Sequence, residues 1–366
     1  MKRILMLLLL CLGLSSCSTD DSEIVSETST IPNIEFVGVD NDNTYLYDYR
    51  AEVGIGEQTN LSSELGLGTN FLTLRQTEQE LSFYTFNSGK FSLLKKDIES
   101  RETDTYIDFY TNTNERSIVW GINTKDQVYF GFYNPKGSTN LALRAISLTT
   151  LNGNDISLEF NINTLYQPIL IDENLFITYL DGQERYKITR YNTDTNTLTQ
   201  TLDFGTSSPS LFDDDLGNLV ILKFAENGKV DMEIRDSNSL SLIKEQNLAL
   251  EQRFLPGPLN ASLIGNKLYY QYTYQQPFII DKGPAIFNIN TSENKVLDFI
   301  GIIDEVEQEL DVSVNIITEY YDPGKNVFLA SYQKFDELYG GVLIINEDGK
   351  LLKNIELDFV PIYFVK

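Results

Sequence analysis

Beyond residue 33, short runs of alternating or continuous apolar residues follow one another, separated by Asn, Asp and Gly. The runs are rich in Tyr, Phe, Ile, Val and Thr, which favour β-strands, and the residues between them are typical of turns. Most of the runs are too short for a helix. This pattern predicts an all-β domain over residues 34–366.

One type of strand recurs along this domain. Its seven copies are 44–49 (TYLYDY), 81–86 (LSFYTF), 128–133 (VYFGFY), 175–180 (LFITYL), 219–224 (LVILKF), 268–274 (LYYQYTY) and 327–332 (VFLASY). The intervals between their first residues are 37, 47, 47, 44, 49 and 59 residues. A period near 47 falls in the range of propeller and solenoid repeats.

Each later copy has an apolar run before it and two after it. Around 219–224, these runs are 210–212, 230–235 and 242–248. Four strands joined by Gly-containing hairpin turns describe a propeller blade, and the domain resembles degenerate β-propellers without the WD or kelch signatures. Seven copies predict seven four-stranded blades. The short first interval leaves open six blades plus an N-terminal extension, and a pair of β-sandwiches is the other alternative.

The two ends of the domain are expected to meet. A propeller ring must close, because an open blade edge would invite aggregation. The apolar run 359–365 is the natural partner for the first strand, 34–39.

Long loops are predicted on one face of the propeller. Antiparallel strands alternate in direction, so the connections from the second to the third strand, and from one blade to the next, share a face. The long connections of this kind are 249–258, 275–284, 301–314 and 333–339. Within 301–314, the spacing of Ile302, Ile303 and Val306 predicts a short amphipathic helix that covers a blade edge.

Planar or forked side chains in these loops are candidate ligand-binding residues, because such groups suit sugar rings, peptides and carboxylates. They are Arg253, Phe254, Phe278, Phe335 and Tyr339. The alternative for each is a loop residue that packs onto its own blade. Trp120 is expected in the core between blades, with a position facing the central channel as the alternative.

Charge and composition exclude several functions. The 366 residues include 28 Lys+Arg and 53 Asp+Glu, a net charge of −25, so we expect no nucleic-acid partner. The absence of histidine removes Ser-His-Asp and Cys-His catalysis. Acidic segments at 192–196 and 213–218 lack a complete calcium-binding pattern and are predicted as hairpin turns. We expect neither a metal nor a cofactor.

The N-terminus has the layout of a secretory signal peptide. Lys2 and Arg3 precede an apolar run at 4–14 that is too short to span a bilayer. Leu14-Ser15-Ser16-Cys17 then resembles the lipobox of bacterial lipoproteins. The resemblance implies cleavage before Cys17 and acylation of that residue; a plain signal peptide with a chance cysteine is the alternative. Cys11 lies in the removed segment, so we expect no disulfide.

Residues 18–33 are rich in Ser, Thr and acidic side chains and predict a flexible tether that reaches about 20 Å on average. Its start, 18–23, resembles the export signal of surface lipoproteins of Bacteroidetes, with an ordinary polar tether as the alternative. The expected organisation is a signal peptide at 1–16, a lipidated cysteine and tether at 17–33, and a β-propeller-like domain at 34–366. Cys17 would then anchor the domain in the outer membrane, facing the cell exterior.

These features favour a non-catalytic binding protein that holds a glycan, a peptide or an outer-membrane partner protein on the long-loop face. A carboxylate-dependent glycan hydrolase or lyase is an alternative, since two acids at the right separation need no histidine. A structural subunit of an envelope complex is another. A buried pair of acids in the axial channel, with raised pKa values, would favour the enzyme, and a shallow aromatic shelf would favour binding.

Overall fold

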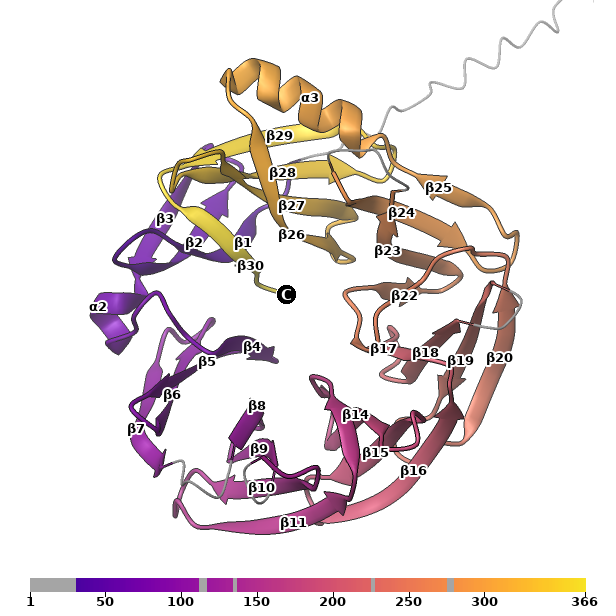
Figure 1. The fold of residues 1–366 in the computed structure, drawn as a ribbon. Helices are drawn as coiled ribbons and strands as arrows, with labels where there is room; N and C mark the ends of the chain where they lie inside the picture. The colour runs from indigo at the N-terminus through magenta and orange to yellow at the C-terminus, as the bar shows by residue number, and fades with distance from the viewer. Residues whose placement is uncertain (1–30, 112–116, 134–136, 225–227, 275–279) are drawn as a thin grey trace, which may run out of the picture. The chain divides into compact units, whose positions relative to one another are not determined.

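The computed structural model describes residues 31–366 except 112–116, 134–136, 225–227 and 275–279. In this part of the chain, strands form seven sheets arranged as blades around a central axis, as Figure 1 shows. The predicted all-β propeller with seven blades is confirmed, and it excludes the six-blade and β-sandwich alternatives. The predicted signal peptide, Cys11, Cys17 and residues 18–30 of the tether lie outside the described residues.

The strands follow the chain around the ring. Blades 1 to 3 contain β1 (Ile34–Val39), β2 (Thr44–Arg50), β3 (Ile55–Asn60), β4 (Thr73–Thr77), β5 (Glu80–Asn87), β6 (Lys90–Asp97), β7 (Thr103–Thr111), β8 (Ser117–Asn123), β9 (Gln127–Tyr133), β10 (Leu141–Ser147) and β11 (Gly153–Glu159). Blades 4 and 5 contain β12 (Ile162–Leu165), β13 (Ile169–Ile171), β14 (Asn174–Asp181), β15 (Tyr186–Asn192), β16 (Thr197–Gly205), β17 (Pro209–Asp213), β18 (Leu219–Phe224), β19 (Val230–Arg235), β20 (Leu242–Leu248) and β21 (Gly257–Pro258). Blades 6 and 7 contain β22 (Ser262–Ile264), β23 (Lys267–Thr273), β24 (Lys282–Asn288), β25 (Asn294–Val296), β26 (Val314–Asp322), β27 (Val327–Lys334), β28 (Gly340–Asn346) and β29 (Leu351–Leu357). The last strand, β30 (Val360–Phe364), belongs to blade 1, and the two described helices are α2 (Leu61–Leu65) and α3 (Phe299–Leu310).

Blade 1 closes the ring with strands from both ends of the chain. Its order is β3-β2-β1-β30, and β30 lies antiparallel to β1 with Phe364 opposite Phe36 and Val360 opposite Val39. The predicted pairing of 359–365 with 34–39 is confirmed. The innermost strand of blade 1 therefore comes from the C-terminal end of the chain, as Figure 1 shows.

This closure explains the irregular repeat intervals. In blades 2 to 7 the recurring segment is the second strand from the axis, if the two-residue β21 beside β17 in blade 5 is set aside. Residues 44–49 instead lie in β2, the third strand of blade 1. The equivalent segment is β1, and counting from Ile34 to Leu81 restores an interval of 47 residues. The long last interval contains the 12-residue helix α3, inserted between β25 and β26.

Helix α3 confirms the helix predicted from the spacing of its apolar residues. Its N-terminus is capped by the Asp298 carboxylate, which accepts a hydrogen bond from the Gly301 amide at 3.0 Å. Ile302, Ile303 and Val306 are buried against blades 6 and 7. The helix therefore covers the outer edge of these two blades, at the rim of the ring in Figure 1.

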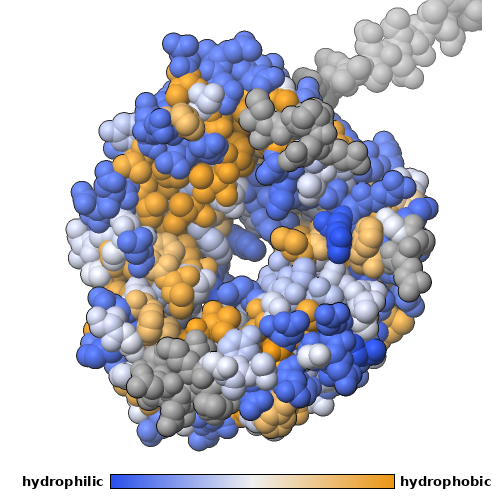
Figure 2. All heavy atoms as spheres, in the orientation of Figure 1, coloured by the Kyte–Doolittle hydropathy of each residue, from blue (hydrophilic) through white to orange (hydrophobic). Residues whose placement is uncertain are grey.

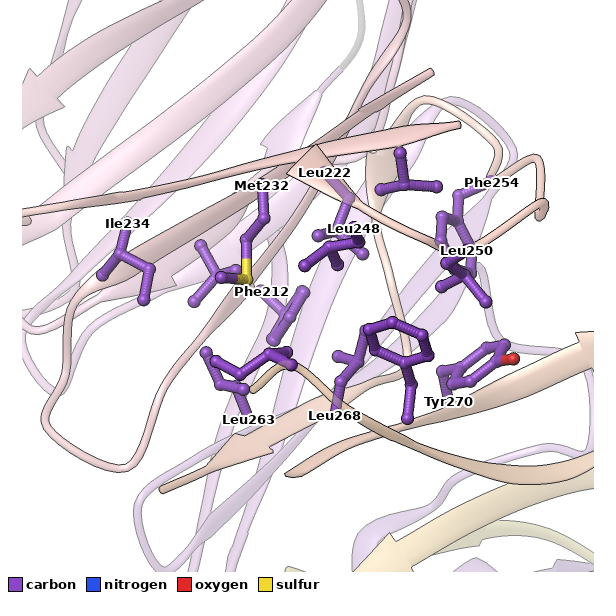
Figure 3. Close-up of a cluster of buried hydrophobic side chains, with 14 of the residues drawn as sticks. Phe212, Leu222, Met232, Ile234, Leu248, Leu250, Phe254, Leu263, Leu268 and Tyr270 are labelled. Atoms are coloured by element: carbon purple, nitrogen blue, oxygen red, sulfur yellow. The ribbon is translucent and has the colours of Figure 1, made fainter. Parts of the chain in front are cut away.

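The core consists of seven clusters of buried apolar side chains, one between each pair of neighbouring blades. Figure 3 shows the cluster between blades 5 and 6, built around Phe212, Met232 and Leu268. Trp120 is 1% exposed in the cluster between blades 3 and 4, which confirms its predicted place between blades. Gly131 makes room for its ring, since a Cβ there would lie 2.3 Å from Trp120 Cε2.

Both acidic segments considered as calcium loops form hairpin turns. The first joins β15 to β16, where Asn192 Oδ1 accepts a hydrogen bond from the Thr195 amide at 2.9 Å. The second joins β17 to β18, where Asp214 Oδ1 accepts a hydrogen bond from the Asn218 amide at 2.8 Å. In both turns the side-chain oxygen satisfies backbone donors, as Asn and Asp commonly do in turns.

Candidate functional site

The long-loop face is the face that carries the connections between blades and those between second and third strands. All four predicted long loops belong to it, because each lies between the corresponding strands. Many of the exposed large apolar side chains also lie there: Leu72, Phe86, Phe160, Leu255, Phe335, Leu338 and Tyr339. Figure 2 shows apolar residues gathered beside a central opening of the ring. This face offers the apolar surface that a ligand could cover.

The turn between β27 and β28 presents two predicted ligand-binding residues together. Phe335 is 56% exposed and Tyr339 is 52% exposed. The turn is closed by a hydrogen bond from the Lys334 amide to the Tyr339 carbonyl at 2.9 Å. The Phe335 amide donates to the Ser313 carbonyl at 2.8 Å, which ties the turn to the segment after α3. Both rings are thus held on an anchored backbone.

The segment after β20 separates the other two described candidates. Arg253 is exposed, and its guanidinium carbon lies 5.8 Å from the centre of the Phe224 ring. Phe254 is only 9% exposed and packs edge-to-face on Tyr270, with ring centres 5.8 Å apart, as part of the cluster in Figure 3. Phe254 therefore fills the core between blades 5 and 6, as the packing alternative expects. Phe278 lies outside the described residues.

A cleft of about 680 Å³ lies on the same face between blades 3 and 4, and sequence reasoning missed it. We call it the blade 3–4 cleft; its lining includes Glu159, Phe160, Asp181 and Lys187. Glu159 ends β11, whereas Asp181 ends β14, so the two acids come from different blades. The sequence holds one local signal for it, the aromatic residue Phe160 directly before Asn161 in the short connection between two strand-like runs.

Lys187 joins the two acids of the cleft. Its ammonium nitrogen lies 2.9 Å from Asp181 Oδ2 and 3.6 Å from Glu159 Oε2. Burial raises the pKa of Asp181, but hydrogen bonds from Lys187 and from the amides of Arg185 and Gln183 outweigh it, and the net pKa is lowered. The hydrogen bond to Asp181 in turn raises the pKa of Lys187. The Asp181–Lys187 pair is therefore ionised at neutral pH.

Glu319 is a buried acid on β26, the innermost strand of blade 7. It is 5% exposed, and its Oε2 atom has no hydrogen-bond partner within the described part of the chain. Burial raises its pKa to about 7, and Lys282 and Gln271 counteract this only in part. The adjoining cavity measures about 20 Å³, which is room for no more than a water molecule. No second carboxylate is among the described groups that shift its pKa.

Comparisons with solved structures agree with the fold. The chain is similar to a candidate 6-phosphogluconolactonase from Bacteroides fragilis, with 14% identity and a TM-score of 0.55, over 93% of this chain and 99% of that one. A second candidate 6-phosphogluconolactonase, from Bacteroides uniformis, is 14% identical with a TM-score of 0.52, over 91% of this chain and 99% of that one. A prolyl endopeptidase is 10% identical with a TM-score of 0.50 over 79% of this chain, which spans 43% of that enzyme's length.

At these identities the likeness shows the propeller fold alone. No protein-family model and no curated protein matches the sequence. Neither of the two described helices has the length and apolar character needed to cross a membrane. The class that the fold defines is an all-β, seven-bladed propeller protein.

Proposed function

We propose that this chain is a non-catalytic binding protein whose long-loop face holds a glycan, a peptide or a partner protein. One observation carries the proposal: Phe335 and Tyr339 project from an anchored turn with more than half of each side chain exposed. Exposed aromatic rings on a rigid backbone give contact area at little cost in conformational entropy. Phe160 adds a third exposed ring on the same face.

The acids of the molecule favour binding over glycan hydrolysis. Two-carboxylate hydrolysis needs one protonated acid and one ionised acid beside the same bond. Glu319 has a raised pKa, but it adjoins a cavity of about 20 Å³ and has no second carboxylate among the described groups that shift its pKa. Asp181 has a substrate-sized cleft, but its lowered pKa makes it a poor proton donor. These observations favour a binding protein over a hydrolase or lyase.

We propose further that Cys17 carries a lipid that anchors the protein at the outer membrane, with the propeller outside the cell. The lipobox resemblance at residues 14–17 and the acidic, polar segment after it support this placement. In cell fractionation, the Cys17→Ser variant should move from the membrane to the soluble fraction. A Cys17→Ser protein that still fractionates with membranes contradicts the lipid anchor.

Binding is tested on glycan and peptide arrays with residues 31–366. A specific hit should be lost when Phe335 and Tyr339 are both replaced by alanine, because the rings supply the contact area. Leu216→Ala is the matched control, since Leu216 is 80% exposed in a turn on the opposite face. Enzymatic turnover of the hit would favour the hydrolase or lyase. The absence of any hit on both arrays would favour the structural subunit.

A further inference from the structure

The ring of Phe160 stands at the rim of the blade 3–4 cleft. It occupies the two-residue turn between β11 and β12 and is 60% exposed. The turn is held by the Phe160 amide, which donates to Glu159 Oε1 at 3.2 Å, and by Asn161, which adopts a left-handed φ of 58°. A tight turn of this kind favours small polar residues, so a large apolar ring here has no local structural reason. Its position at the rim of a cleft points instead to a role in contacting a ligand.

The cleft behind this ring is lined by polar groups. Asn161, Asn163 and Gln183 are exposed, and their amides offer both donors and acceptors. Glu159 and Asp181 add acceptors, while Lys187 adds a donor. One aromatic face together with several planar hydrogen-bonding groups suits a ligand that has both an apolar face and hydroxyl groups.

The charged groups of the cleft are held in place before any ligand arrives. Asp181 Oδ1 accepts hydrogen bonds from the amides of Gln183 and Arg185, at 2.8 and 3.0 Å. Asp181 Oδ2 lies 2.9 Å from the Lys187 nitrogen, which also lies 3.6 Å from Glu159. Acceptors fixed in this way lose little freedom when they bind a hydroxyl group.

We infer that the blade 3–4 cleft binds a neutral sugar residue of a glycan, with one face of the sugar ring stacked on Phe160. This inference rests on the proposed function, for which it names the ligand class at one site. The two carboxylates and one ammonium group give the cleft a net negative charge, and the whole chain also carries a net charge of −25. That charge disfavours phosphates and uronic acids. An apolar peptide side chain would cover the polar groups of the cleft without offering them hydrogen bonds.

The test uses the full chain in mild detergent and a panel of neutral and acidic oligosaccharides, with affinity measured by calorimetry. Phe160→Ala should weaken binding of a neutral oligosaccharide by about tenfold or more, and Phe160→Tyr should retain it, because the tyrosine keeps the stacking face. Lys187→Met should also weaken binding, since it frees Asp181 and Glu159 from their shared partner. Melting curves should show that Phe160→Ala folds like the parent chain, as expected for an exposed position.

The controls separate this inference from the proposed function. Neutral-glycan binding that survives Phe160→Ala but is lost in the Phe335→Ala, Tyr339→Ala double variant overturns the inference and leaves the proposed function standing. If the protein binds only acidic glycans or only peptides, the inference is likewise overturned and the proposed function still stands. Absence of any bound oligosaccharide overturns the inference, and silence on the peptide array as well favours the structural subunit over a glycan- or peptide-binding protein.

Discussion

Gln76 and Lys366 exchange two hydrogen bonds across the join between the two ends of the propeller. The Lys366 amide donates to Gln76 Oε1 at 2.8 Å, and Gln76 Nε2 donates to the Lys366 carbonyl at 2.9 Å. The side-chain amide of Gln76 thus pairs with the backbone beyond β30 as a further strand would. It connects the innermost strand of blade 2 to the innermost strand of blade 1.

Replacing Gln76 with alanine should lower the free energy of unfolding by about 1–2 kcal/mol, because both hydrogen bonds are lost at the closure of the ring. Gln58 is exposed on β3, the strand of blade 1 farthest from β30, so Gln58→Ala should change the stability by less than about 0.5 kcal/mol. Urea denaturation of the two variants measures the difference. Equal stabilities would show that closure depends on the β1–β30 pairing alone.

A second connection between blades should make stability depend on acid. The rings of Tyr269 and Tyr321 stack with centres 3.6 Å apart, and both hydroxyls donate to Glu347 Oε1, at 2.6 and 2.7 Å. Burial raises the pKa of Glu347, but hydrogen bonds from Lys267 and the two tyrosines lower the pKa by more than burial raises it. The net pKa is therefore below its usual 4.5. A lowered pKa in the folded state gives stability above about pH 4.5 that is lost as the pH falls.

Glu347→Gln should therefore cost about 1–3 kcal/mol at pH 7 and less at pH 3, because the stability that the parent carboxylate contributes is lost progressively as the pH falls below about 4.5. Chemical denaturation at the two pH values measures this. Glu293→Gln, at an exposed position in the neighbouring blade, is the control and should show no such change. A cost for Glu347→Gln that is independent of pH would mean that shape, and not charge, holds the tyrosine pair.

Local periodicity was enough to predict most of the fold. The strand repeats, the helix at Ile302 and Ile303, and the pairing of the chain's ends each depend on residues close in sequence or on a general requirement for closure. The repeat pattern places the first copy in β2 instead of β1, because TYLYDY and the β1 sequence IEFVGV both favour a strand. β1 is the second strand of its blade because β30, from the far end of the chain, takes the innermost place. This long-range pairing leaves no mark in the local sequence of β1 or β2.

The site was less predictable because it depends on contacts between blades. Phe254 and Phe335 are both phenylalanines in long loops, yet one is 9% exposed and the other 56%. Irregular loops have no period from which burial can be inferred. Likewise Asp181 and Glu159 are 22 positions apart and meet only because Lys187 of β15 lies between them.

The different placement of two neighbouring candidates gives a third prediction. Phe254→Ala should lower the free energy of unfolding by about 3–5 kcal/mol, because it leaves a cavity beside Tyr270 in the cluster between blades 5 and 6. Arg253→Ala should cost less than about 1 kcal/mol, since Arg253 is exposed and its contact with Phe224 is a surface one. Urea denaturation of both variants tests the assignment. A small effect of Phe254→Ala would mean that this ring leaves the core in solution.

Glu319 should make the propeller less stable as the pH rises. The unfolded chain releases this proton near the usual pKa of 4.5, whereas burial raises the folded pKa to about 7. Between these values the folded protein binds more protons, so its stability falls with rising pH, by up to about 3 kcal/mol above pH 7. Glu319→Gln keeps the size of the side chain without the charge, and should stabilise the protein at pH 8 relative to pH 5. Glu337→Gln, at an exposed turn position, should leave the pH profile unchanged. Parallel profiles for the parent chain and Glu319→Gln would show that water reaches this carboxylate and that it ionises without cost.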